Sequence, residues 1–127
     1  MKKTVYSITA AAGVFLAACG GKAKDAPTPQ ITLSDGATAR VKIVVPDSST
    51  HCETYAADFL KKYLDKASGA DFAIIRESAA EQGKPAIYVG ATKRAKAALP
   101  DFNPDSAGYD TAVLKTHGGD IVIGGPK

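Results

Sequence analysis

The sequence predicts an α/β (α+β) domain in which helices pack on a mixed β-sheet in a two-layer unit. Residues 30–127, about a hundred residues, suffice for one hydrophobic core. Short β-branched runs alternate along them with two segments of helical periodicity. Val44 also makes the run 40–45 apolar on both faces, which is typical of a strand covered from two sides.

Three elements are expected near the start of this domain. A short strand is expected at 31–33, followed by a turn at Ser34-Asp35-Gly36. A second strand is expected at 40–45, with Val41, Ile43 and Val45 on one face, and Pro46 ends it.

The clearest helix is expected after Thr50. Thr50 and Glu53 form a capping box, and Gly69 provides the C-terminal stop. An apolar stripe at helical spacing is predicted to face the core: Cys52, Ala56, Phe59, Leu60, Tyr63 and Ala67. The opposite, solvent-facing side carries Asp58, Lys61, Lys62, Asp65 and Lys66, with Asp58 and Lys62 spaced to pair.

The remaining elements follow at short intervals. The sequence predicts a strand at 72–76, a loop at 78–85, a strand at 86–89, a short helix from Thr92 to Leu99, a loop at 100–108, a hairpin of 109–116 and 120–123 around His117-Gly118-Gly119, and a loop from 124.

Composition narrows the class of protein. The chain has 127 residues, 45% of them hydrophobic and 23% charged, which excludes a wholly disordered chain or a collagen-like repeat. The net charge is +3, but from Gln30 onward 12 basic residues balance 12 acidic ones. A neutral domain gives no electrostatic reason to expect nucleic acid as a partner.

The first 18 residues are interpreted as a lipoprotein signal peptide. Lys2 and Lys3 precede an apolar run that is short and rich in alanine and glycine. Leu16-Ala17-Ala18-Cys19 resembles the lipobox of bacterial lipoproteins, which implies cleavage before Cys19 and attachment of fatty acyl chains such as palmitate to it. Residues 19–29 then form a flexible tether.

The lipobox implies that the protein is attached to a membrane, and it also implies a cellular location. The expected location is the bacterial cell envelope, outside the cytoplasm. Gly20 rather than aspartate follows Cys19, which favours the outer membrane or the cell surface over the inner membrane. Cys52 is then the one remaining thiol, and it is expected to be a small buried hydrophobic residue rather than a reactive group.

No catalytic, metal or cofactor site is predicted. His51, Cys52 and His117 lack zinc-ligand spacing, and Asp101, Asp105 and Asp110 lack calcium-loop spacing. Gly90 before Thr92 suggests an anion site, although a structural turn is favoured. Ser48 and Ser49 near His51 are better explained by the helix cap than by a hydrolase triad.

The order of motifs resembles a known domain. Ile43-Val44-Val45-Pro46, the helix beginning near Glu53, Ala86-Ile87-Tyr88-Val89-Gly90, Gly108-Tyr109 and Ile121-Val122-Ile123-Gly124-Gly125 follow one another. Over residues 38–126 this is similar to the small non-catalytic domain that precedes the barrel in family 20 hexosaminidases, family 67 α-glucuronidases and related glycosidase-like lipoproteins.

The resemblance implies a domain that is incomplete at its C-terminus. In the family a further helix and then the catalytic barrel follow, and neither is present here. Without that last helix, part of one sheet face is expected to be exposed and adhesive.

Two functions are therefore expected. The first is a lipid-anchored, non-catalytic accessory domain of a glycoside hydrolase-like protein acting on extracytoplasmic carbohydrate, with a catalytic barrel downstream in cis. The alternative is a small stand-alone lipoprotein that binds glycan or a protein partner. The chain itself is not expected to be an enzyme, because no paired carboxylates stand in a recognisable motif.

Overall fold

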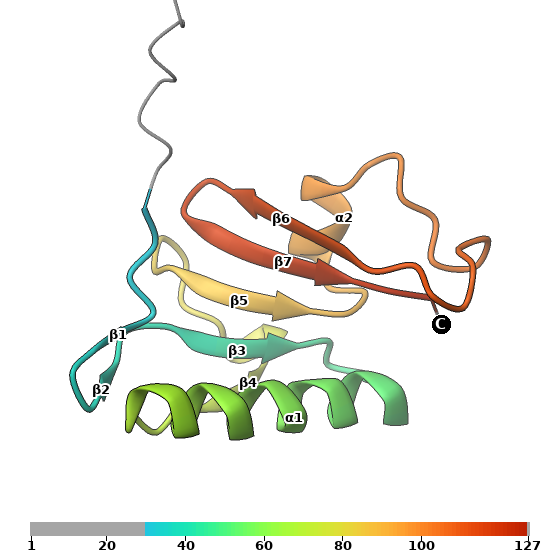
Figure 1. Ribbon diagram of the computed structural model, residues 1–127. Coiled ribbons are helices and arrows are strands. Elements are labelled where there is room, and N and C mark those ends of the chain that lie inside the picture. Colours follow the sequence, from blue (N-terminus) through green and yellow to red (C-terminus); the bar gives the residue numbers. More distant parts are fainter. Residues whose placement is uncertain (1–29, 127) are drawn as a thin grey trace, which may run out of the picture.

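The computed structural model describes residues 30–126. The predicted signal peptide, the lipid-attachment residue Cys19 and the whole of the predicted tether lie outside the described residues. Five strands form one sheet in the order β4-β3-β5-β7-β6 (Figure 1). The pairs β4–β3, β3–β5 and β5–β7 are parallel, whereas β6 runs antiparallel to β7. The α/β class and the mixed sheet with helices packed on it are confirmed.

The beginning of the domain differs from the prediction. Residues 31–33 are not a strand; a small hairpin of β1 (Ser34–Asp35) and β2 (Thr38–Ala39) follows them. Gly36, at φ 56°, lies in its turn, and the Leu33 carbonyl accepts a hydrogen bond from the Arg40 N–H at 2.8 Å. Ile31 and Leu33 instead pack on the edge of the core.

The central strand β3 (Lys42–Val45) is buried on both faces, as predicted. Ile43 and Val45 point to the same side as Val41, toward a core that includes Ala57 and Phe72. Val44 points to the other side and joins a second apolar cluster. The sheet therefore has a core on each of its faces.

Helix α1 (His51–Ser68) has the predicted ends. Its capping box is formed, and Gly69 closes the C-terminus in the left-handed region at φ 74°. The predicted inward face is wrong for most of the stripe. Ala57, Leu60 and Leu64 face the core, whereas five of the six predicted residues are exposed: Cys52, Ala56, Phe59, Tyr63 and Ala67. The expected Asp58–Lys62 pair is absent among the described residues, where Lys61 pairs with Asp65 instead.

The later elements lie close to their predicted positions. Strand β4 (Ile74–Arg76) is shorter than expected, and a 3₁₀ turn, η1 (Glu77–Ala79), begins the predicted loop. Strand β5 (Ala86–Val89) and helix α2 (Lys93–Ala98, capped by Thr92) follow. The final hairpin joins β6 (Val113–His117) to β7 (Asp120–Gly124).

Two corrections apply to that hairpin. Its first strand begins at Val113 rather than at 109, because Thr111 N–H bonds back to the Gly108 carbonyl and keeps this stretch in a turn. His117 belongs to the strand, opposite Asp120, and only the two glycines, Gly118 and Gly119, make the turn at positive φ.

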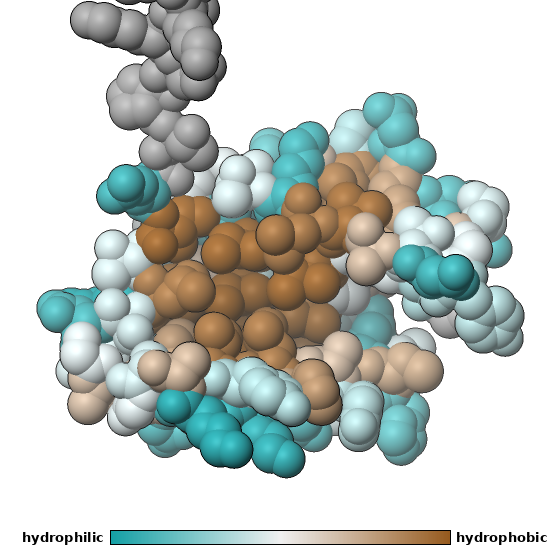
Figure 2. Space-filling view, in the orientation of Figure 1, coloured by the Kyte–Doolittle hydropathy of each residue, from teal (hydrophilic) through white to brown (hydrophobic). Residues whose placement is uncertain are grey.

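The two helices cover opposite faces of the sheet. Ala95 and Ala98 of α2 pack on Val44, Tyr88 and Val122. On the other face α1 packs on β3, β4 and β5. No helix among the described residues covers β7 and β6 on the α1 side, and a broad apolar surface is visible there (Figure 2).

Candidate functional site

The candidate site is the uncovered half of the sheet beside α1. Cross-strand register places Ile87 opposite Ile121, Val89 opposite Ile123, and Ile123 opposite Leu114. Residues directly opposite one another share a face, so this apolar row continues from the α1-covered half onto β7 and β6. Leu114 is 72% exposed, and Ile121 and Ile123 are half-buried. We call Leu114, Ile121 and Ile123 the open half-sheet.

The width of the sheet explains why half of it is open. Strands lie about 4.8 Å apart, so the outer strands of a five-stranded sheet are separated by roughly 19 Å. A packed helix occupies roughly 10 Å. One helix therefore covers about half of such a face, and α1 lies over β3 and β4 rather than at the centre.

A groove of about 310 Å³ runs between α1 and the ends of β5 and β7. Cys52 and Ala56 of α1 form one wall, Val89 and Ile123 contribute to the sheet side, and Leu99 and Phe102 lie at the far side. The groove is therefore mainly apolar. Its chemistry suits an apolar side-chain surface better than a sugar, whose hydroxyl groups need polar partners.

Two residues of the stripe that was predicted to face the core, Cys52 and Ala56, form this wall. On a helix they are one turn apart. Their side of the helix is turned roughly 100° away from the Ala57–Leu60–Leu64 face. The apolar arc of α1 is thus wider than its contact with the sheet. The part of the arc that carries Cys52 and Ala56 borders the groove.

Glu53 fixes the end of the groove. Its Oε2 accepts the Thr50 N–H at 2.8 Å, and its Oε1 accepts the Ala91 N–H at 2.8 Å. The carboxylate thus joins the start of α1 to the turn after β5. Gly90 is required there, because it has φ 86° and a Cβ on it would lie 2.4 Å from Glu53 Oε1.

The anion site considered near Gly90 and Thr92 is not formed. The Lys93 and Arg94 N–H groups at the start of α2 both donate to Glu77 Oε1, at 2.7 and 3.3 Å. Glu53 occupies the equivalent position at α1. The protein's own carboxylates therefore accept hydrogen bonds at the start of both helices.

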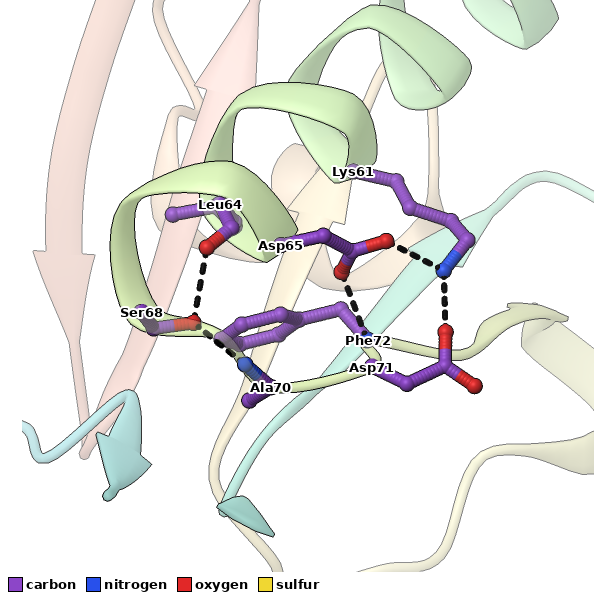
Figure 3. Close-up of polar contacts among 7 residues, drawn as sticks. All are labelled: Lys61, Leu64, Asp65, Ser68, Ala70, Asp71 and Phe72. Atoms are coloured by element: carbon purple, nitrogen blue, oxygen red, sulfur yellow. Dashed lines mark hydrogen bonds and ion pairs between the residues drawn. The ribbon is translucent and has the colours of Figure 1, made fainter. Parts of the chain in front are cut away.

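A polar cluster holds the opposite end of α1 (Figure 3). Asp65 accepts the Lys61 ammonium at 2.7 Å and the Phe72 N–H at 2.8 Å. The hydrogen bond from Lys61 and then that from Phe72 lower the pKa of Asp65, and the carboxylates of Asp65 and Asp71 raise the pKa of Lys61. The cluster turns the chain so that Phe72 enters the core, where it is fully buried.

Cys52 and Ser49 are among the residues that were weighed as metal or catalytic candidates. Cys52 is exposed, so the expectation of a buried hydrophobic residue is wrong. Ser49 Oγ accepts a hydrogen bond from the Arg76 guanidinium and contacts Thr54, as part of the segment before α1. Within residues 30–126, no three His, Cys, Asp or Glu side chains are grouped in a way that could hold a metal ion.

Sequence reasoning missed one buried ion pair. Asp120 is almost fully buried; its carboxylate accepts the Ala86 N–H at 3.1 Å and the Arg94 Nε–H at 2.7 Å. It joins β5, β7 and α2. Its two partners lie 26 and 34 positions away in the sequence, so no local sequence signal marks the pair.

The sequence matches no known protein family and no curated protein. Among the helices of residues 30–126, none combines the length and the apolar character that crossing a bilayer requires.

Proposed function

We propose that the chain is a lipid-anchored, non-catalytic accessory domain of a glycoside hydrolase-like protein that acts on carbohydrate outside the cytoplasm. The open half-sheet is the observation that supports this role most. An apolar sheet face bordered by a groove and by an apolar helix wall is a packing surface, which an accessory domain needs.

The partner for this surface lies in the same polypeptide, downstream of residue 127. The proposal follows the resemblance of residues 38–126 to domains that precede a catalytic barrel. One further helix laid beside α1 would cover β7 and β6, because the uncovered width is about one helix diameter. The barrel would then pack outside that helix and perform the hydrolysis.

The lipid on Cys19 would hold this assembly at the envelope. The acyl chains and the tether both belong to residues outside the described range, so the proposal takes them from the lipobox pattern. Radiolabelled palmitate fed to cells expressing the chain should label the wild type and not Cys19→Ala. A labelled Cys19→Ala variant would contradict the anchor.

Sequencing the coding DNA beyond codon 127 tests the accessory role. The expected result is an open frame that continues into a helix and several hundred residues of alternating strands and helices. The longer protein should hydrolyse an aryl glycoside, whereas residues 20–127 alone should not. Hydrolysis by residues 20–127, or a stop codon directly after Lys127, would contradict the proposal; the stop codon would favour a small binding lipoprotein.

A further inference from the structure

The outer face of α1 carries exposed aromatic and basic side chains that packing does not explain. Tyr55 is 63% exposed, Phe59 50% and Tyr63 53%, although their rings contact one another along the helix. Lys62 and Lys66 are exposed beside them. We call these five residues the outer α1 face.

The charge on this face is free to act on a partner. Lys62 and Lys66 make no ion pair with any residue between 30 and 126, whereas the neighbouring Lys61 is held by Asp65 and Asp71. His51 and Asp58 are also exposed on this side of the helix, and Asp65, seven positions after Asp58, lies there as well but is paired with Lys61. The outer α1 face therefore has a positive charge within a domain whose total charge from residue 30 is zero.

Exposed aromatic rings next to lysines suit the headgroup region of a bilayer. Amphipathic rings sit at the level of the headgroups, and each basic side chain near an anionic surface adds about 1 kcal/mol of attraction, or about fivefold in affinity. A flat glycan platform is less suitable, because the rings of Phe59 and Tyr63 are inclined by 50°.

The tether keeps a membrane within reach. Ten residues separate Cys19 from Gln30, so the fully extended chain spans at most about 35 to 40 Å. A domain held this close samples the bilayer surface at high local concentration, and even a weak attraction then orients it.

We propose that the outer α1 face docks on an anionic lipid surface and so orients the tethered domain on its membrane. The inference rests on the lipid anchor of the proposed function, but the two can fail separately. Docking is a property of the folded domain and is measurable without the lipid, whereas acylation is measured by palmitate labelling.

Sedimentation with vesicles tests the docking. Residues 20–127, which contain every described element, are mixed with vesicles of phosphatidylglycerol and phosphatidylcholine or of phosphatidylcholine alone. Binding is expected to the anionic vesicles and should weaken as salt rises. Lys62→Glu/Lys66→Glu should lower the partition coefficient at least tenfold, and Tyr55→Ser/Phe59→Ser should also lower it.

The matched control is Lys93→Glu/Lys96→Glu, which makes the same charge change at two exposed lysines of α2, across the sheet. It should bind almost as well as the wild type. Equal losses in both double variants, or no binding of the wild type to anionic vesicles, would overturn the proposal. A change in oligomeric state without vesicle binding would instead assign the face to a second copy and would equally overturn it. Circular dichroism checks that each variant is folded.

Discussion

Glu53 and Gly90 depend on each other. The Glu53 carboxylate reaches the Ala91 N–H only because residue 90 has no Cβ and takes a positive φ. The capping box itself was predictable from Thr50 and Glu53, since its partners are three residues apart. Its link to the β5–α2 turn spans 38 positions and was not predictable.

Gly90→Ala should destabilise the protein more than Gly83→Ala. Both glycines have positive φ, which costs a non-glycine residue about 1–2 kcal/mol, but a Cβ at Gly83 meets open space. At Gly90 the new methyl group also displaces Glu53 and leaves a backbone donor unpaired, for about 1–3 kcal/mol more. Urea unfolding of the two variants measures the difference, and equal losses would show that Glu53 relaxes at no cost.

Asp65 should make the free energy of unfolding depend on pH in the acidic range. Its pKa in the folded protein lies below the ordinary value of 3.8, so the ionised carboxylate stabilises the fold at pH above about 4. That contribution is lost as pH falls through the lower folded-state pKa. The advantage of the wild type over Asp65→Asn in free energy of unfolding should therefore shrink between pH 5 and pH 2. Asp58→Asn is the control, because Asp58 forms no ion pair within residues 30–126; a similar shrinkage there would refute the assignment.

At the scale of elements, α1 shows what periodicity can and cannot predict. Its start, its end and its amphipathic character were predicted, because these depend on neighbours within one or two turns. The apolar residues, however, cover more than half of the helix surface. Which part of so wide an arc meets the sheet depends on where β3 and β4 lie, and that is tertiary information.

Leu64→Ala and Phe59→Ala distinguish the two sides of α1. Leu64 packs on the core cluster, so its truncation should cost about 2–3 kcal/mol. Phe59 is half exposed, so its truncation should cost about 1 kcal/mol or less. Chemical denaturation measures both. A larger loss at Phe59 would mean that the originally predicted stripe, and not the observed one, faces the core.

The strands show the same difference between features that depend on sequence neighbours and features that depend on tertiary packing. The centres of β3, β5 and β7 were predicted from β-branched runs, and the alternation of Val41, Ile43 and Val45 against Val44 correctly predicted two covered faces. The predicted ends of the strands were less accurate than their predicted centres. The hairpin near Gly36 forms beside the apolar residues 31–33, and the hydrogen bond from the Arg40 N–H to the Leu33 carbonyl extends its pairing by one residue.

At the scale of the whole molecule, the sequence predicted the fold class and an exposed part of one sheet face. It did not predict which strands are open. The order β4-β3-β5-β7-β6 places the last hairpin at one edge, farthest from α1, so β7 and β6 are the strands left uncovered. Candidate metal-ligating residues were dismissed on spacing alone, and within residues 30–126 no three His, Cys, Asp or Glu side chains are grouped so that they could hold a metal ion.

Thiol reactivity at Cys52 measures whether a downstream part of the protein covers the groove, because Cys52 lines the groove and is the one cysteine in residues 20–127. The rate of its modification by a maleimide is compared between residues 20–127 and the longer protein encoded by the continued frame. Rapid modification of the isolated domain and at least tenfold protection in the longer protein are expected, with full reactivity restored in urea. Equal rates in the two folded proteins would show that nothing downstream covers the groove and would contradict the accessory role.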